Sequence, residues 1–381
     1  MPGHLTDTLI FLLVVGARLL VPLLIPRFPL PAIVAALVID AADQSIFQKY
    51  TNLDLGGYQS YDKALDIYYL TIAYLSVIRN WTNGFAVEVA RFLWYYRLVG
   101  VVLFELLEMR ALLFVFPNTF EYFFIAYEVV RTGWNPRRLA RSTVLWMAGV
   151  IWVAIKLPQE WWIHIAQNDF TDFMKETVLG VDADAAWSTA FGNRPAITAV
   201  LVGVAIAAVV GGRILWVRLP ERDWTIRFNV DRSIVPGSAG VANGGIGVDD
   251  MDDEGPELRW PIIEKITLIS LVSMVFGQML GISISNWQVI PAAALVVVVN
   301  AGISHWFVRS GAEWGALLPS FVSLALINTA LLMFYASWAG EGRVNRALAL
   351  FFGALLTLIT VMYDRFRGMR RRAVEVTVQL A

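Results

Sequence analysis

Residues 195–217 read PAITAVLVGVAIAAVVGGRILWV, a run of 23 residues in which Arg213 is the one charged side chain. About 20 consecutive apolar residues in a helix span the hydrocarbon core of a bilayer, which is about 30 Å thick. The stretch therefore predicts a transmembrane helix. Similar stretches recur along the chain, so the same argument extends to most of the sequence.

The composition of the whole chain agrees with a lipid environment. The 381 residues are 57% hydrophobic and 16% charged, with a mean hydropathy of +0.60, whereas soluble chains are about 45–50% apolar and about 25% charged. The apolar content excludes a disordered chain, and a net charge of −1 argues against a nucleic-acid partner. The absence of cysteine excludes disulfides, thiolate nucleophiles and cysteine-based metal sites.

Eleven stretches of suitable length predict an all-α fold, a polytopic integral membrane helix bundle with the lipid bilayer as its surroundings. The second is interrupted by Asp40 and Asp43, and the third has barely 17 residues. The predicted spans are 5–25, 29–47, 64–80, 85–107, 110–131, 141–157, 195–217, 262–283, 287–308, 315–338 and 344–364.

The arginines set the predicted orientation, because positive residues that flank transmembrane helices stay in the cytoplasm. The run from Arg365 to Arg372 marks the C-terminus as cytoplasmic, and the other large basic clusters fall on the same side. The acid-rich loops 40–66 and 158–194 then lie outside. With eleven spans, the N-terminus is outside. Arginine outnumbers lysine 25 to 5, which favours a high-GC bacterial source and a multi-pass protein of the bacterial plasma membrane.

A hydrophilic segment divides the chain. Residues 220–261 are rich in glycine and acidic side chains and predict a flexible acidic cytoplasmic linker. We expect a seven-helix membrane part over 1–219, with buried charges and outer amphipathic helices. A four-helix membrane part with a basic cytoplasmic tail follows over 262–381. Its spans are nearly free of charge and predict a packing bundle or a dimer surface.

Charged residues inside the first part are the most informative feature, because each costs about 2.5–3.5 kcal/mol at the centre of a membrane helix. Helix geometry predicts an ion pair between Glu88 and Arg91, which are three residues apart. We also expect Arg97 near Glu121, and Glu88 or Arg91 near Glu128. The candidates for a transport path or polar cavity are Arg18, Glu88, Arg91, Arg97, Glu121 and Glu128. A static ion-pair network that fixes helix register is the alternative.

A second group of candidates is predicted at the outer face. Pro158 predicts the first turn of an amphipathic helix at the outer interface, with Glu160 and His164 on one face. The outer candidates are Asp40, Asp43, Asp62, Asp66, Glu105, Glu160 and His164. Their side chains could bind a divalent cation or act as a general base, or could form the mouth of a polar cavity. The sequence points to no other cofactor.

Charges at outer, middle and inner depths favour a transporter or permease for a small polar solute or ion, because passage needs polar groups at every depth. Two other classes stay open. One is a membrane-embedded enzyme that acts on a lipid-linked substrate at the outer face. The other is a non-catalytic subunit of an envelope membrane complex, with a membrane-protein partner or a second copy of the chain.

Overall fold

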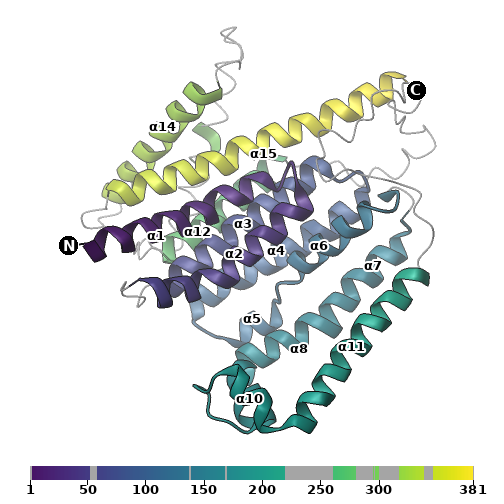
Figure 1. The fold of residues 1–381 in the computed structure, drawn as a ribbon. Helices are drawn as coiled ribbons and strands as arrows, with labels where there is room; N and C mark the ends of the chain where they lie inside the picture. The colour runs from purple at the N-terminus through teal and green to yellow at the C-terminus, as the bar shows by residue number, and fades with distance from the viewer. Residues whose placement is uncertain are drawn as a thin grey trace.

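The computed structural model describes residues 2–51, 58–136, 139–167, 170–218, 261–279, 295, 297–299, 317–338 and 346–380. Helices dominate these residues, and no β-strand occurs among them. The all-α prediction is therefore confirmed for the described part of the chain (Figure 1). The predicted linker 220–261, apart from Pro261, and most of the predicted span 287–308 lie outside the described residues.

The first part of the chain forms the body of the bundle. Its helices are α1 (Pro2–Leu20), the 3₁₀ turn η1 (Val21–Leu24), α2 (Pro29–Tyr50), α3 (Tyr58–Asn80), α4 (Gly84–Leu107), α5 (Ala111–Val115) and α6 (Thr119–Arg131). An outer arm follows, with α7 (Arg141–Val150), η3 (Ile151–Lys156), α8 (Leu157–Glu160), η4 (Trp161–Ile165), α9 (Phe170–Asp172), η5 (Phe173–Leu179), α10 (Trp187–Asn193) and α11 (Pro195–Arg218).

Three long helices of the second part are described, namely α12 (Pro261–Met279), α14 (Leu317–Trp338) and α15 (Arg346–Leu380). α12 packs against α3 and α4, and α15 packs against α3, α12 and α14. The two parts of the chain are therefore in direct contact across the bundle, with α15 crossing over its top in Figure 1.

Helix α3 lies at the centre of the bundle. It contacts α1, α2, α4, α12 and α15, and most of its residues from Ala64 to Ile78 are buried. The third predicted span was one of the two weakest by hydropathy. Its polar and aromatic composition reflects a central position among other helices, where hydrogen bonds and ring contacts are made on several sides.

Two predicted spans differ from the structure. The stretch 110–131 does not form one helix, because the chain breaks at Phe116–Asn118 between α5 and α6. Pro117 lies in this break and cannot donate a backbone hydrogen bond. Conversely, Pro158 does not begin a separate amphipathic helix. Residues 141–165 run on as one helix, in which π-helical turns at η3 and η4 flank the proline.

Three helical segments within the described residues are long and apolar enough to cross a membrane, namely Thr6–Leu24, Arg141–Ile165 and Pro195–Ile214. The others carry too many charges, are broken, or extend beyond the described residues. Helix α4, for example, has 24 residues but contains Glu88, Arg91, Arg97 and Glu105.

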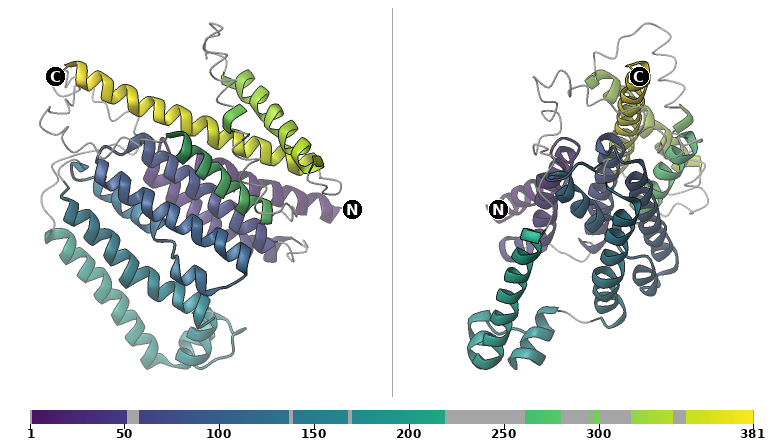
Figure 2. Two further views of the ribbon diagram at one scale, coloured as in Figure 1. Left: turned by 180° about the vertical axis from the view of Figure 1, so that it is seen from behind. Right: turned by 90° about the vertical axis from the view of Figure 1, so that its right-hand side faces the viewer.

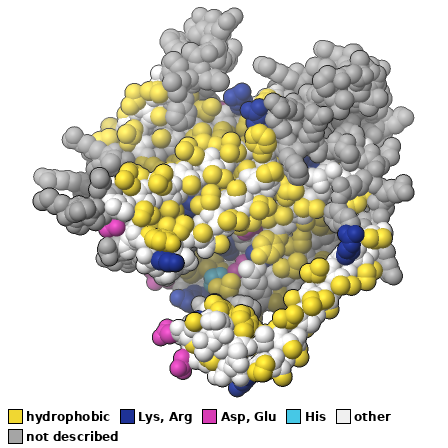
Figure 3. Space-filling model, viewed as in Figure 1, with side chains coloured by type: hydrophobic (Ala, Val, Ile, Leu, Met, Phe, Trp, Pro, Cys, Tyr) yellow, Lys and Arg dark blue, Asp and Glu magenta, His cyan; other side chains and the backbone are white. Residues whose placement is uncertain are grey.

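Beside a buried apolar core, the described residues include many exposed large apolar side chains and several buried charges. Large apolar side chains such as Leu13, Trp146 and Val209 are more than 70% exposed, whereas Arg18, Glu121 and Lys156 are at most 5% exposed. Figure 3 shows apolar side chains spread over one face of the molecule. α11 is lined with exposed valine and isoleucine side chains and runs outside the bundle (Figure 2). This arrangement suits a lipid environment.

Candidate functional site

The break between α5 and α6 is held open by polar side chains from two neighbouring helices. On α4, the Tyr96 hydroxyl donates to the Val115 carbonyl at 2.8 Å, and Arg97 Nη1 donates to the Phe116 carbonyl at 3.1 Å. The Asn118 backbone N–H donates to Glu160 Oε1 at 3.2 Å. Groups that lost their helical partners at the break are thus satisfied by side chains, as a buried backbone requires.

Gly100 allows this break to lie against α4. A Cβ atom at Gly100 would be 2.1 Å from the Phe116 Cβ atom, closer than two carbon atoms can approach. The absence of a side chain at this position is therefore part of how the site is built.

Five residues meet beside the break, and we call them the polar centre: Arg97, Asn118, Glu121, Lys156 and Glu160. Asn118 Nδ2 donates to Glu121 Oε2 at 2.5 Å. The Lys156 ammonium lies 3.7 Å from the centre of the Tyr122 ring and interacts electrostatically with Glu121 and Glu160. Arg97 also interacts electrostatically with Glu121 and Glu160. Two cations and two carboxylates therefore share one buried region, as the prediction of Arg97 near Glu121 required.

Three polar atoms in this region are buried without a hydrogen-bond partner among the described residues. Two belong to the polar centre, and the third belongs to the first residue of α6. They are Arg97 Nε, Asn118 Oδ1 and Thr119 Oγ1. Buried polar groups in proteins are nearly always paired with protein atoms or ordered water. These three atoms are therefore open to water or a bound species, as are others elsewhere in the described bundle.

Glu160 connects the polar centre to the surface. Its Oε2 atom lies 3.0 Å from His164 Nε2, and the His164 side chain is 20% exposed. The two side chains are four residues apart, so the predicted shared helix face is confirmed. In Figure 3, acidic, basic and histidine side chains gather at a hollowed part of the molecular face.

Arg18 gathers three of the predicted outer carboxylates. Its guanidinium forms ion pairs with Asp40 and Asp43 of α2, and its Nη2 atom lies 2.8 Å from Asp66 Oδ1 of α3. Arg18 and Asp43 are buried, whereas the Asp66 side chain is 38% exposed. We call these four residues the Arg18 cluster.

Tyr69 lies between the Arg18 cluster and the polar centre. It is one helical turn after Asp66 on α3, and it interacts electrostatically with Glu121. It also interacts electrostatically with Asp40 and Asp66. The two groups of charges, predicted separately at different depths, are thus joined through one tyrosine.

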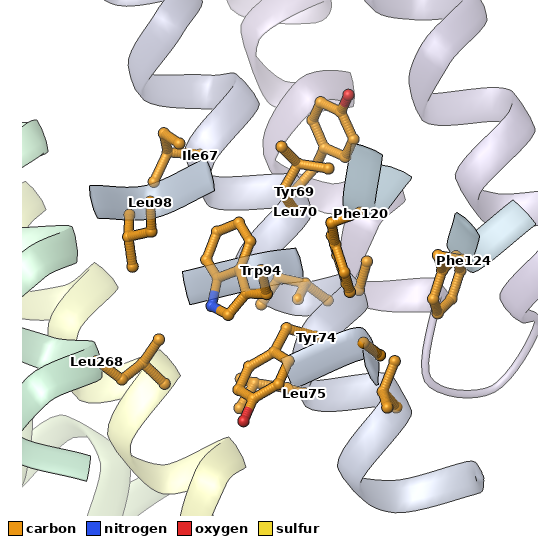
Figure 4. Packing of buried hydrophobic residues seen from close by; sticks show 14 of the residues in the cluster. Ile67, Tyr69, Leu70, Tyr74, Leu75, Trp94, Leu98, Phe120, Phe124 and Leu268 are labelled. Atoms are coloured by element: carbon orange, nitrogen blue, oxygen red, sulfur yellow. The ribbon is translucent and has the colours of Figure 1, made fainter. Parts of the chain in front are cut away.

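A layer of buried aromatic rings lies directly beside the polar centre. Tyr74, Trp94 and Phe120 contact one another with ring centroids 5.5–6.4 Å apart. Phe120 contacts Phe124, which in turn stacks on Trp81. Figure 4 shows the hydroxyls of Tyr69 and Tyr74 pointing away from each other, on opposite sides of Trp94 and Phe120.

Beyond the aromatic layer are two further groups of charges. Glu128 Oε1 accepts hydrogen bonds from Trp81 Nε1 and Arg131 Nη1, both at 2.6 Å. Arg91 pairs with Glu88 at 3.2 Å, which confirms the predicted i,i+3 pair, and with Glu264 at 3.3 Å. The prediction that Glu88 or Arg91 lies near Glu128 is therefore wrong. Arg131 takes the place expected for those residues.

Glu264 is surrounded by tyrosine hydroxyls and arginines. Tyr74 donates to its carboxylate, Tyr363 donates to Oε2 at 2.7 Å, and Arg367 Nη1 lies 3.3 Å from Oε2. The expectation that the second part of the chain is nearly charge-free therefore missed a buried carboxylate. Glu264 lies in the first turn of α12. In the sequence it stands at the edge of the predicted span 262–283.

Two outer candidates remain, Glu105 and Asp62. Glu105 is half-buried on α4. Asp62 belongs to α3, but its side chain lies outside the described residues. Among the side chains that are described, no group of three His, Asp or Glu could hold a metal ion, and Arg18 takes up the carboxylates of Asp40, Asp43 and Asp66. The divalent cation stays a prediction.

Sequence reasoning missed Lys156, Tyr69 and Glu264 as site residues. Lys156 was visible as a lysine at the end of an apolar span, which is an unusual place for an unpaired ammonium. The other two gave no separate signal, because their importance comes from contacts between distant segments.

Comparisons with models of known protein families, with curated proteins and with solved structures gave no match to this chain.

Proposed function

We propose that the protein is a polytopic membrane protein of the bacterial plasma membrane, with about 11 transmembrane helices, its N-terminus outside and its C-terminus inside. The exposed apolar exterior and the buried charges support this proposal. Helices such as α4 can cross a bilayer despite their charges, since those charges face other helices instead of lipid.

Within that membrane protein, we propose a permease for a small polar solute or ion. The observation that carries this proposal is the connection of charged groups from His164 through the polar centre and Tyr69 to the Arg18 cluster. Its two ends, at His164 and Asp66, are partly exposed, and its middle is buried. Isolated ion pairs that only fix helix register would have no need of such continuity.

The broken helix supports the same function. Discontinuous helices at membrane depth are typical of transporter binding sites, where half-helix ends and freed backbone groups line the path of the solute. Here the α5–α6 break, with its unpartnered polar atoms, lies beside two cations and two carboxylates.

The aromatic layer explains how the path would be closed. Glu121 and Glu128 are seven residues apart on α6, which is about 10 Å along the helix axis. Phe120, Phe124 and Trp81 fill this interval and are at most 2% exposed. With the proposed orientation, the arrangement corresponds to a state in which the polar centre faces outward and is sealed from the cytoplasm.

Charge movement in reconstituted proteoliposomes tests the proposal. Currents on a solid-supported membrane would be recorded after concentration jumps of sodium, potassium, protons, small amino acids and sugars. We expect a response to at least one of them that is lost in Arg97→Gln and kept in Glu176→Gln, since Glu176 is exposed on η5. Absence of any response above protein-free liposomes, or an equal response in Arg97→Gln, would contradict the permease.

A further inference from the structure

The polar centre contains a carboxylate whose neighbours fit both of its protonation states. Glu121 is 5% exposed, and its Oε2 atom is 2.5 Å from the Asn118 amide nitrogen. The other end of the same amide, Oδ1, is buried without a described partner. A carboxamide donates through its nitrogen and accepts through its oxygen, and the two ends exchange places when the amide rotates.

We propose that the polar centre binds a proton, with the Glu121 carboxylate as the acceptor. This inference rests on the permease proposed above and names its ion. In the ionised form, Asn118 Nδ2 donates to the carboxylate, as in the structure. Adding one proton converts the carboxylate to a carboxylic acid, and the rotated amide accepts that acid hydrogen through Oδ1. No bond other than the new O–H forms, and the charge of the site rises by one.

The surroundings of Glu121 balance both forms. Lys156 of η3 and Arg97 of α4 face it as cations, Asp40 of α2 as an anion, and Tyr69 of α3 through its hydroxyl. Helix α7 also packs on α6, but its Arg141 guanidinium lies over the Phe85 ring. The carboxylate thus offsets nearby positive charge when ionised, and Glu160 still offsets part of that charge when Glu121 is neutral.

The surroundings of this carboxylate reach the surface on two sides. On one side, His164 contacts Glu160, and the backbone N–H of Asn118 donates to Glu160, a contact that positions Glu160 but carries no proton. On the other side, the partly exposed Asp66 lies one helical turn before Tyr69, which interacts electrostatically with both Asp66 and Glu121. A hydroxyl can accept a proton and donate another, so Tyr69 can relay between the two carboxylates.

The test is infrared difference spectroscopy of the full chain in lipid, titrated from neutral to acidic pH, because the carbonyl stretch of a protonated carboxyl group is separate from that of a carboxylate. We expect a band that appears on acidification and is missing in Glu121→Gln. The band should return, at a shifted frequency, in Glu121→Asp. Gel filtration would establish that each variant is folded, and Glu128→Gln, beyond the aromatic layer, should keep the band.

A titration with no such band, a band that does not change with pH, or a band that persists in Glu121→Gln would overturn the proton site. The measurement needs no transported solute. Its failure alongside solute-driven currents would therefore reject the proton and leave the permease standing, whereas a titrating Glu121 without currents would reject the permease and leave the proton site.

Discussion

Arg18 shows how a single side chain can organise distant parts of the chain. Its partners Asp40, Asp43 and Asp66 are 22, 25 and 48 residues away, so no local spacing connects them. The sequence predicted that Arg18 must find a partner inside the membrane, because an unpaired charge there is costly. It separately predicted an acidic cluster at the outer face. The sequence could not show that these two predictions concern the same site, because the residues meet only through the packing of α1 against α2 and α3.

Removing Arg18 should strongly destabilise the protein. In Arg18→Ala, Asp40, Asp43 and Asp66 lose their common cation, and breaking a buried ion pair costs about 3–5 kcal/mol. Thermal unfolding in detergent should therefore begin at a clearly lower temperature. Arg18→Lys keeps the charge but loses the fork of the guanidinium, so we expect an intermediate loss. Arg213→Ala, at an exposed position on α11, is the control, and an equal effect at both sites would refute the role of Arg18.

At the scale of the element, the break between α5 and α6 is the feature that hydropathy could not reveal. Residues 110–131 are apolar enough to be taken as one span even though Pro117 lies within them. A proline in a helix can produce a kink or a complete break. The outcome here depends on Tyr96, Arg97 and Glu160, whose side chains satisfy the freed backbone groups. Those contacts involve other helices and are absent from the local sequence.

Substituting Gly100 should disturb this element specifically. In Gly100→Ala, the new methyl group meets the Phe116 side chain at once, and overpacking of this kind costs about 1–3 kcal/mol. We expect a lower unfolding temperature and a weaker transport response. The matched control is Gly203→Ala on α11, where a Cβ atom would meet no described atom within 4 Å. If both substitutions had the same effect, the close approach of α4 to the break would be wrong.

At the scale of the whole molecule, the all-helical fold followed from composition and periodicity, but the relation of its two parts did not. The buried contacts of Glu264 with Tyr74, Arg91 and Tyr363 join α12 to α3, α4 and α15. Hydropathy separates these parts at the linker, because it reports where a chain is apolar and not which apolar faces meet. The functional class rests on the same contacts between distant helices.

The proposed orientation can be tested directly because the chain contains no cysteine. Single substitutions Asp184→Cys, in the predicted outer loop, and Gly368→Cys, near the C-terminus, introduce one thiol each at an exposed position. A membrane-impermeant maleimide added to intact cells should label the first and spare the second until the membrane is opened. The reverse pattern would contradict the orientation. Labelling of both thiols in intact cells would contradict an odd number of spans between residues 184 and 368.

The central claim is that buried charges of the N-terminal helices form one connected interior. A double-mutant cycle between Asp66→Asn and Glu121→Gln, measured in the free energy of unfolding, tests this connection. Both carboxylates interact electrostatically with Tyr69. Residues in one network are coupled by about 0.5–3 kcal/mol, whereas independent sites add to within about 0.3–0.5 kcal/mol. We expect measurable coupling for this pair and additivity for Asp66→Asn with Glu128→Gln, across the aromatic layer. Additive effects for Asp66 and Glu121 would contradict the central claim.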